Sequence, residues 1–371
     1  MPSPYSPFDT FEREEAFRRA LSRWYLRGHR SLPWRATTNA YHIWLSEVIL
    51  QQTRVDQGTA YYHRFLEAFP RVQDLASADE DRVLKLWQGL GYYSRARNLR
   101  AAAIQIVEQF GGELPQDRKA LLSLPGIGPY TAAAILSFAY NLPFATVDGN
   151  VQRVISRLAA IAEPVDTPKG RKKIDLVAES LLDKRQARIF NNATMELGAT
   201  VCLPSSPLCS DCPVSSFCLA LRLDLTQELP KKSPKGKLRN RYFHYIDIRD
   251  PEEAKMLLGR RGNGDIWQGL YQPLLIETAF PAETDEFLQH GIWEELSQLF
   301  GKIQLVGFTN TSVHILSHQR IHARLYRVRA HLGNRLDSPI KDYRLIAIED
   351  LPNYAVSKLV DSLFSEKNVL F

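Results

Sequence analysis

Two acidic side chains stand alone in long stretches of sequence that carry no other formal charge. Glu47 is the only charged residue of positions 36–53, and Asp148 is the only one of positions 120–152. Removal from water disfavours the charged form of a carboxyl group, so its pKa rises and it can hold a proton near neutral pH. A proton donor and a nearby anion suit the cleavage of an N-glycosidic bond. The donor improves the leaving group, and the anion stabilises the positive charge that develops on the sugar.

Each of these acids also has a purely structural explanation. Glu47 could be a buried carboxylate paired with an arginine, because ion pairs perturb acids as catalysis does. Asp148 could be the N-cap of the helical pattern that begins at Val151. Without support from the rest of the chain, the structural explanations would be favoured. A cap can also fix a carboxylate that serves a second role.

All four cysteines fall within seventeen residues, with the spacing Cys202-x6-Cys209-x2-Cys212-x5-Cys218. Four thiolates this close together can hold one metal centre. Structural zinc sites usually present two short cysteine pairs, and this run contains only one such pair. A [4Fe-4S] cluster accepts four cysteines at irregular spacing and is therefore favoured over zinc.

The string Leu124-Pro-Gly-Ile-Gly-Pro-Tyr-Thr131 lies between two helical patterns. Gly126 and Gly128 would let the backbone approach a ligand, and the helix that follows would point free N–H groups at it. A DNA phosphate suits that geometry. An ordinary corner between two helices is the alternative.

These residues need a mostly helical scaffold, and helical periodicity runs from about residue 8 to residue 221. The apolar residues recur at helical spacing in six segments, at 11–25, 44–50, 83–87, 99–110, 132–138 and 151–161. The segment 222–241 follows and is rich in basic residues, with Pro and Gly, which indicates a linker. It could be a plain tether or an added grip on phosphates.

The pattern changes after the linker and predicts a smaller α+β domain over residues 242–371. Strand-like segments occupy 242–248, 255–258, 303–309 and 324–328, and two amphipathic stretches, 284–300 and 348–363, are predicted to be helical.

Composition is that of a folded protein, with 44% hydrophobic and 24% charged residues, and the net charge of +6 is compatible with a polyanionic partner. No stretch reaches the length and apolarity of a membrane span, and residues 1–7 lack a hydrophobic signal region. We therefore expect no membrane association and a reducing location, the cytoplasm and nucleoid of a bacterial-type cell.

Taken together, the cysteine spacing, the Leu-Pro-Gly-Ile-Gly string and the two isolated acids resemble the MutY-type adenine DNA glycosylases of the endonuclease III, or helix-hairpin-helix, superfamily. The resemblance covers nearly the whole chain and is strongest over residues 32–218. It implies a helical glycosylase domain over residues 8–221, one [4Fe-4S] cluster on the loop 202–218, and a Nudix-like domain after the linker.

The resemblance also implies roles for individual residues. Glu47 would protonate an adenine flipped out of the helix, and Asp148, with Asn150 beside it, would stabilise the cationic sugar. The adenine pocket would include Trp34, Arg35 and Leu50. The residues expected to wedge into the duplex or bind its backbone are Gln52, Leu90, Tyr92, Gly126 and Gly128; core packing is the alternative for Leu90 and Tyr92.

Tyr130 separates this chain from its bifunctional relatives, which place a lysine at this position and cut the strand through a Schiff base. A tyrosine cannot form that imine. We therefore expect a monofunctional glycosylase, with Tyr130 shielding or orienting the reacting sugar.

In the second domain, His314-Ile-Leu-Ser-His318 resembles the motif that contacts 8-oxoguanine, with Ser317 and His318 in the contacting positions. A surface loop is the alternative for His318. Two positions depart from the family pattern: Leu316 stands where a phenylalanine is usual, and Asn192 where a longer glutamine or glutamate is expected. No Nudix box is present, so nucleotide hydrolysis by this domain is not expected.

The predicted function is excision of adenine opposite 8-oxoguanine or guanine in double-stranded DNA, by a monomer. One alternative is an endonuclease III-like glycosylase/lyase acting on oxidised pyrimidines, against which Tyr130 and the C-terminal extension argue. The other is a non-catalytic iron–sulfur redox sensor that binds DNA, which would not need isolated acids.

Overall fold

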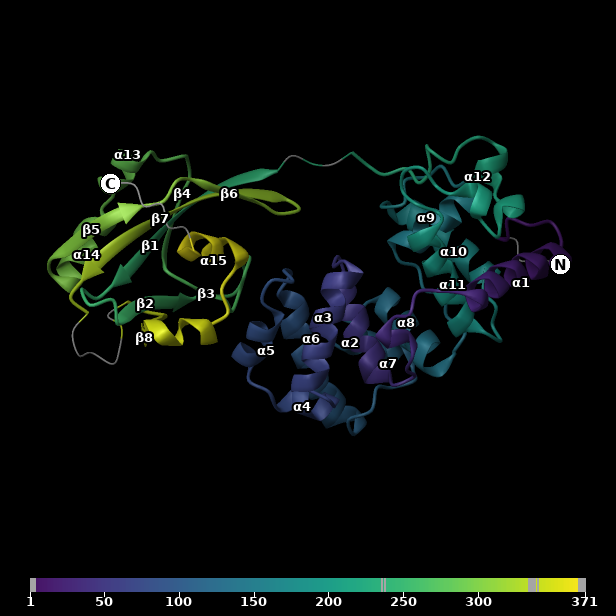
Figure 1. Ribbon diagram of the computed structural model, residues 1–371, viewed down its shortest axis with the longest axis horizontal. Coiled ribbons are helices and arrows are strands. Elements are labelled where there is room, and N and C mark those ends of the chain that lie inside the picture. The colour runs from purple at the N-terminus through teal and green to yellow at the C-terminus, as the bar shows by residue number, and fades with distance from the viewer. Residues whose placement is uncertain (1–4, 235, 237, 333–337, 339, 366–371) are drawn as a thin grey trace. The chain divides into compact units, whose positions relative to one another are not determined.

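The computed structural model describes residues 5–234, 236, 238–332, 338 and 340–365. The chain forms two compact units, the first made of residues 1–77 and 98–234 and the second of residues 78–97 and 235–371 (Figure 1). Lys235 and Lys237 of the expected linker lie outside the described residues.

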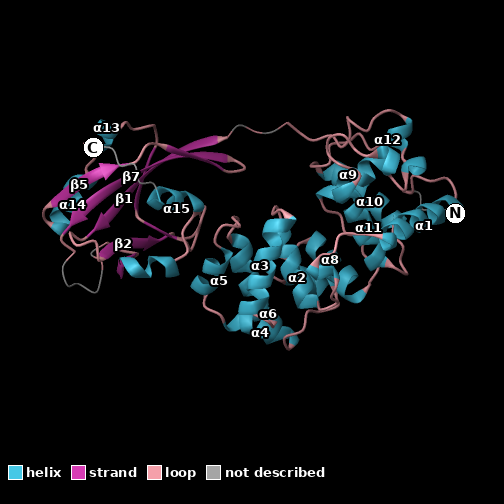
Figure 2. Cartoon of the chain, in the orientation of Figure 1, coloured by secondary structure: helices cyan, strands magenta, loops and turns pink. Residues whose placement is uncertain are grey.

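The first unit is built of helices and contains no β-strand among its described residues (Figure 2). Its α-helices are α1 (Phe11–Arg27), α2 (Ala40–Leu50), α3 (Val55–Ala68), α4 (Val72–Ser77), α7 (Arg118–Ser123), α8 (Pro129–Tyr140), α9 (Gly149–Leu158), α10 (Pro168–Leu181), α11 (Ala187–Thr200) and α12 (Leu219–Arg222), and α6 (Ser94–Phe110) runs into it from the second unit. Short 3-10 turns occupy η1 (Pro33–Arg35), η2 (Cys209–Asp211) and η3 (Ser215–Phe217).

Two helices at the centre of this unit are buried and mostly apolar. In α8, the nine consecutive residues Thr131–Ala139 are buried, and in α2 the run Ile43–Ile49 is buried. A helix with apolar residues around its whole circumference is stable only inside a protein, and α2 and α8 pack against each other there. Glu47 on α2 and Tyr130 on α8 are thereby brought together.

Polar caps fix where several of these helices begin. Asn39 accepts hydrogen bonds from the first turn of α2, and the side chain of Asp148 accepts one from the Val151 N–H at the start of α9. The cap predicted for Asp148 is therefore present.

The second unit contains an eight-stranded sheet with the order β3-β2-β1-β7-β5, in which β4 pairs with β1, β6 with β7 and β8 with β2. Its strands are β1 (Arg239–Arg249), β2 (Lys255–Arg260), β3 (Tyr271–Gln272), β4 (Leu274–Thr278), β5 (Ile303–Phe308), β6 (Ser312–Ile315), β7 (Gln319–Ala330) and β8 (Tyr343–Ala347). Strands β1 and β7 are parallel, and the other pairs are antiparallel.

Helices line both faces of this sheet. One core contains α15 (Lys358–Ser365), and the other contains α13 (Thr284–Leu288) and α14 (Ile292–Phe300). The two stretches predicted to be helical, 284–300 and 348–363, are each interrupted in the structure. The first breaks between Leu288 and Ile292, and the second is a 3-10 segment, η4 (Ile348–Asn353), followed by α15. Pro352 lacks the N–H that a longer α-helix would need there.

The predicted linker is shorter than expected, because both of its ends are structured. The Leu229 and Lys231 carbonyls accept hydrogen bonds from Arg157 and from the Val165 N–H of the first unit, and Asp166 accepts from Ser233. Strand β1 then begins at Arg239.

Helix α5 (Glu80–Trp87) belongs to the second unit, although the sequence placed it within the helical domain. Arg260 forms ion pairs with Glu80 at 2.8 Å and Asp81 at 3.0 Å, and the Tyr271 hydroxyl donates to Asp81 at 2.8 Å. Polar contacts therefore join this helix to β2 and β3.

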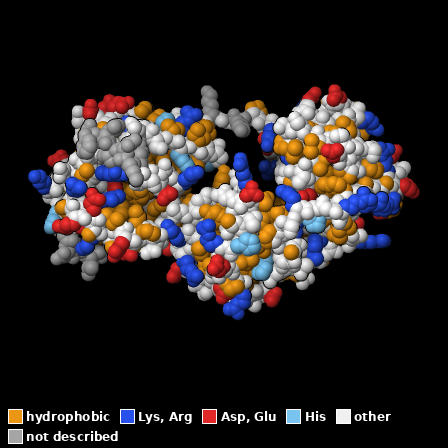
Figure 3. Space-filling view, in the orientation of Figure 1, with side chains coloured by type: hydrophobic (Ala, Val, Ile, Leu, Met, Phe, Trp, Pro, Cys, Tyr) orange, Lys and Arg blue, Asp and Glu red, His pale blue; other side chains and the backbone are white. Residues whose placement is uncertain are grey.

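Among the described residues, no helix combines the length and the apolarity needed to cross a membrane. Lysine, arginine and acidic side chains are interspersed over the visible face of each unit (Figure 3).

Candidate active site

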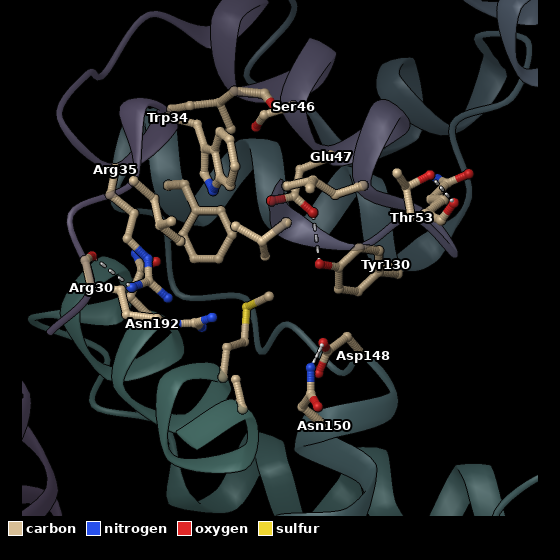
Figure 4. Close-up of a pocket in the computed structure, with 18 of the residues that line it drawn as sticks. Arg30, Trp34, Arg35, Ser46, Glu47, Thr53, Tyr130, Asp148, Asn150 and Asn192 are labelled. Carbon is tan, nitrogen blue, oxygen red and sulfur yellow. Dashed lines mark hydrogen bonds between the residues drawn. The ribbon is translucent and has the colours of Figure 1, made fainter. Parts of the chain in front are cut away.

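A cavity of about 690 Å³ opens in the first unit. Its lining comes from η1, α2, α8, α9 and α11 and includes Glu47, Tyr130, Asp148 and Asn150 (Figure 4). Segments more than 100 residues apart thus supply one site, and all four residues predicted to carry the chemistry line it.

Glu47 is buried, with 7% of its surface exposed, and its Oε2 accepts a hydrogen bond of 2.6 Å from the Tyr130 hydroxyl. Burial, with a smaller contribution from the charge of Asp148, raises the pKa of Glu47 to about 7, although the bond from Tyr130 and the charge of Arg35 act in the opposite direction. Glu47 can therefore hold a proton near neutral pH and deliver it to a bound group.

Asp148 has more hydrogen-bond donors than Glu47. Its Oδ1 accepts from the Val151 N–H at 2.7 Å, and its Oδ2 accepts from the Asn150 side-chain amide at 2.9 Å. Burial raises the pKa of Asp148 above its ordinary value, although these hydrogen bonds act in the opposite direction. The positive end of α9 also favours the anion. Burial thus raises the pKa of both carboxyl groups, and they differ in their hydrogen-bond donors, of which Asp148 has more to stabilise a negative charge.

The rest of the cavity combines apolar and aromatic side chains with polar ones and the cation of Arg35. Trp34, Arg35 and Leu50 line it as predicted. Trp34 is 9% exposed, and its ring packs edge to face with that of Tyr62, with 5.6 Å between the ring centroids. A planar base could stack on such walls.

One pair of contacts at this cavity was missed by the sequence analysis. Glu196 of α11 is 2% exposed and forms ion pairs with Arg30 at 2.8 Å and Arg35 at 2.9 Å. These arginines hold the pKa of Glu196 at about 2 against the effect of burial. A signal was available in Arg35 itself, since a half-buried arginine needs an acidic partner, but nothing in the sequence indicated which one.

Asn192 also lines the cavity, and its side-chain amide donates to the Arg188 carbonyl of its own helix at 2.9 Å. The shorter side chain at this position is therefore engaged with the backbone.

The two predicted phosphate-binding glycines form a tight turn between α7 and α8. Gly126 has φ +75°, and a Cβ atom there would lie 2.8 Å from the Asn98 Cβ, so the turn needs glycine at this position. Gly128 is the N-cap of α8, and a Cβ atom there would meet nothing within 4 Å. Open space in front of free helix N–H groups suits an anion.

The four cysteines line one cavity together with Arg157 and Leu208. Arg157 is 2% exposed; its Nη1 lies 3.3 Å from the Cys202 Sγ and donates to the Leu203 carbonyl at 2.7 Å. Burial raises the pKa of Cys212 to about 12. No group of three or more His, Cys, Asp or Glu in the described ranges is arranged to hold a metal ion. The four cysteines and the Arg157 guanidinium line the same cavity, as the ligands of an anionic metal–thiolate centre would, but the sulfur atoms do not form a metal-binding arrangement here, so the centre stays a prediction.

Comparison with known proteins decides the family. The family model for the HhH-GPD superfamily base excision DNA repair protein matches residues 45–179, and that for the NUDIX domain matches residues 244–366. The chain is 33% identical to the adenine DNA glycosylase of Mus musculus, over 98% of this chain and 80% of that protein. The chain belongs to the adenine DNA glycosylase family.

One further relative agrees with this assignment, and one solved structure shares the fold. The adenine DNA glycosylase of Buchnera aphidicola subsp. Baizongia pistaciae is 33% identical, over 82% of this chain and 84% of that protein. A structure titled a trapped endonuclease III–DNA covalent intermediate, an estranged-adenine complex, matches 59% of this chain and 100% of its own with a TM-score of 0.51. At 21% identity it shows the fold alone. The predicted family, fold class and enzyme class, a DNA glycosylase of base excision repair, are confirmed.

Two of the three residues predicted to wedge into DNA have strained backbones. Gln52, with φ +59°, is exposed at the end of α2, and Tyr92, with φ +47°, is 47% exposed. Non-glycine residues in the left-handed region are concentrated at functional sites. Leu90 is only 8% exposed, so the packing alternative describes its position in the free protein.

In the second unit, Ser317 and His318 are the two central residues of the turn between β6 and β7. The Leu316 N–H donates to the Gln319 carbonyl at 2.8 Å and closes this turn. Both side chains are exposed, with the Ser317 Oγ 3.0 Å from the His318 Nδ1, whereas Leu316 packs against the core beside α15. Leucine at position 316 therefore serves the core, and the polar pair is free to meet a ligand.

Proposed function

We propose that this protein excises adenine opposite 8-oxoguanine or guanine in double-stranded DNA, without cutting the strand. The observation that carries the proposal is the pairing of Glu47, whose pKa is about 7, with the hydrogen-bonded Asp148 in one cavity. A flipped adenine would stack against the wall at Trp34 and accept the Glu47 proton on a ring nitrogen, which weakens the bond to the sugar.

Asp148 would then face the positive charge that develops on the sugar carbon. Asn150 and the Val151 N–H hold its two oxygens, so the carboxylate needs little rearrangement when the charge forms. Water would attack the sugar and complete the hydrolysis. Tyr130 offers no amine for a Schiff base, which supports the monofunctional reading.

The four cysteines are proposed to hold one [4Fe-4S] cluster. With four protein ligands and no open position, a bound cluster would brace the loop rather than act on substrate. A brown protein with broad visible absorption supports this proposal; a colourless protein loaded with zinc contradicts it.

Ser317 and His318 are proposed to contact the oxidised base opposite the adenine. Both present hydrogen-bonding atoms at an exposed turn. We further propose that the protein acts as a monomer in the cytoplasm.

A single-turnover assay tests the reaction. Duplexes carrying adenine opposite 8-oxoguanine or guanine should release adenine, and adenine opposite thymine should not. Because a general acid typically contributes about 10²–10⁴-fold, Glu47→Gln should slow release by at least about 100-fold. Asp148→Asn should do likewise. Wild-type rates in either variant would refute that residue's role, and strand nicking without alkali would favour a lyase.

A further inference from the structure

The hairpin of β6 and β7 lies in an unusually long stretch without acids. Positions 296–335 contain no Asp or Glu, although 41 acids in 371 residues would place about four in any 40 positions (41/371 × 40 ≈ 4.4). The same stretch contains six Lys or Arg and four His. In the described part of the chain, this stretch supplies β5, β6 and β7, and the β6–β7 end extends past the body of the sheet (Figure 1).

Strand register places six side chains from three strands on one face at this end. Val313 of β6 pairs with His322 of β7, which pairs with Tyr242 of β1. Ile315 of β6 pairs with Arg320 of β7, which pairs with Asn240 of β1. Paired residues and every second residue along a strand share a face. We call this set, Val313, Ile315, Arg320, His322, Asn240 and Tyr242, the hairpin face.

The hairpin face is exposed and internally ordered. Val313 is 52% and Ile315 61% exposed, the latter an unusual value for an isoleucine on a strand. The His322 ring stacks on Tyr242 at 5.1 Å, and its Nε2 lies 3.3 Å from the Asn240 Oδ1. Farther along the same side of the sheet, His244 and Tyr326 pack with Phe287 of α13. Helices thus cover the body of this face, and the end beside Ser317 and His318 stays open to solvent.

We propose that the hairpin face binds the sugar–phosphate backbone of duplex DNA beside the lesion. The guanidinium of Arg320 and the amide of Asn240 would meet phosphate oxygens, while Val313 and Ile315 would pack against deoxyribose. The absence of acids throughout the hairpin avoids repulsion of phosphates, and this complementarity favours DNA over an apolar protein partner. The proposal extends the proposed function, because the face adjoins the turn assigned to the oxidised base.

The test compares equilibrium binding by the full-length chain with Glu47→Gln as a common background. The face variants are Arg320→Gln and the double variant Val313→Ser/Ile315→Ser. Their matched controls are Arg344→Gln on β8 and Leu299→Ser on α14, both exposed positions outside the face. The probes are duplexes with adenine opposite 8-oxoguanine and fully paired duplexes, each measured over a range of salt concentrations.

The face variants should bind both duplexes more weakly than the background protein, by about tenfold in each case, because backbone contacts carry no sequence information. Arg320→Gln should also reduce the slope of log Kd against log salt by about one. Ser317→Ala should weaken binding only to the duplex that contains 8-oxoguanine. Unchanged affinity and salt slope in the face variants, or equal losses in the controls, would overturn the proposal.

Single-turnover rates separate this proposal from the proposed function. In an otherwise wild-type chain, the face variants should keep the saturating rate of adenine release within about twofold. A wild-type protein that releases no adenine would refute the proposed function, while a loss of affinity for both duplexes in the face variants would still support the backbone contact.

Discussion

At the scale of single residues, Glu47 and Asp148 share one cavity but receive different support from their neighbours. Glu47 has one hydrogen bond, from Tyr130, against nearly complete burial. Asp148 has two and stands at a helix N-terminus. Burial raises the pKa of both groups, so the difference lies in the donors around Asp148, which can stabilise its anion and support the proposed roles of Glu47 as acid and Asp148 as anion.

Removing the Tyr130 hydroxyl should move the alkaline limb of the pH–rate profile upward. The rate should fall as pH rises through about 7, where Glu47 loses its proton. Tyr130 donates to the charged carboxylate and lowers the pKa of Glu47. Tyr130→Phe should therefore shift the midpoint of this limb to higher pH, by about half a pH unit to one pH unit. Single-turnover rates between pH 5 and 9 measure the shift. Tyr140→Phe, on the same helix but bonded to the Leu114 carbonyl, should leave the limb in place; a downward shift in Tyr130→Phe would contradict the assignment.

The raised pKa of Glu47 also predicts a cost in stability. Between the ordinary value of 4.5 and about 7, the folded state binds more protons than the unfolded state, so stability falls as pH rises through this window. Glu47→Gln removes the titrating group, so the stability of the variant should not fall in this window. The free energy of unfolding of the variant relative to that of the wild type should therefore be higher at pH 8 than at pH 4, by up to about 3 kcal/mol. Denaturant unfolding at the two pH values measures the difference, with the exposed Glu67→Gln as a control that should show none.

Isolation in an uncharged stretch marked Glu47 and Asp148 as candidates in the sequence, because a lone charge among apolar residues must be either paired or functional, and the family resemblance then favoured a functional role. It could not predict that Glu196 pairs with Arg35. That contact depends on how η1 packs against α11, 161 positions along the chain (196 − 35 = 161). Long-range packing leaves no periodic trace in a single sequence.

At the scale of elements, α9 joins the two sites of the first unit. Asp148 caps its N-terminus, Arg153 donates to the Cys202 carbonyl at 2.7 Å, and Arg157 donates to the Leu203, Pro204 and Leu229 carbonyls. One helix therefore holds both the cavity carboxylate and the backbone of the cysteine loop.

Loss of the buried Arg157 guanidinium should destabilise the cysteine loop. Arg157→Gln leaves several carbonyls without a donor, and each costs about 1–3 kcal/mol. We therefore expect the free energy of unfolding to fall by at least about 3 kcal/mol, and the chain to retain less iron from the proposed cluster. Thermal unfolding and iron analysis measure both effects. Arg171→Gln, an exposed position on α10, is the matched control. Normal iron content and stability in Arg157→Gln would contradict the role given to this side chain.

Periodicity predicted most elements but not their interruptions. The stretch 284–300 keeps an amphipathic pattern across the break at Gly291, since the pattern reports which side faces the core and not whether the backbone is continuous. Pro352 was the available signal for the second break.

At the scale of the whole molecule, the boundary between the units does not follow chain order. Helix α5 comes from the N-terminal half, yet its acidic residues pair with Arg260, some 180 positions away (260 − 80 = 180). A sequence shows α5 as one amphipathic helix among several and cannot indicate which core it joins.

Weakening the contacts of α5 should loosen that helix without unfolding the rest of its unit. Arg260→Gln removes the ion pairs to Glu80 and Asp81, and amide hydrogen exchange over Glu80–Trp87 should become faster, by several-fold. Arg329→Gln breaks a comparably exposed ion pair, with Glu253, and should leave exchange in α5 unchanged. Equal exchange over α5 in both variants would show that these pairs do not secure it.

The hydrogen bond between Tyr130 and Glu47 also bears on how glycosylases of this superfamily can change into one another during evolution. A lysine at position 130 would place an ammonium group beside Glu47 and favour the ionised carboxylate, because an opposite charge stabilises the charged form. The same substitution that supplies an amine for strand cleavage would thus deprive a bound base of the proton donor proposed here, Glu47. A single codon change would weaken one reaction before the other is established, so a route between the two activities requires a compensating change around Glu47.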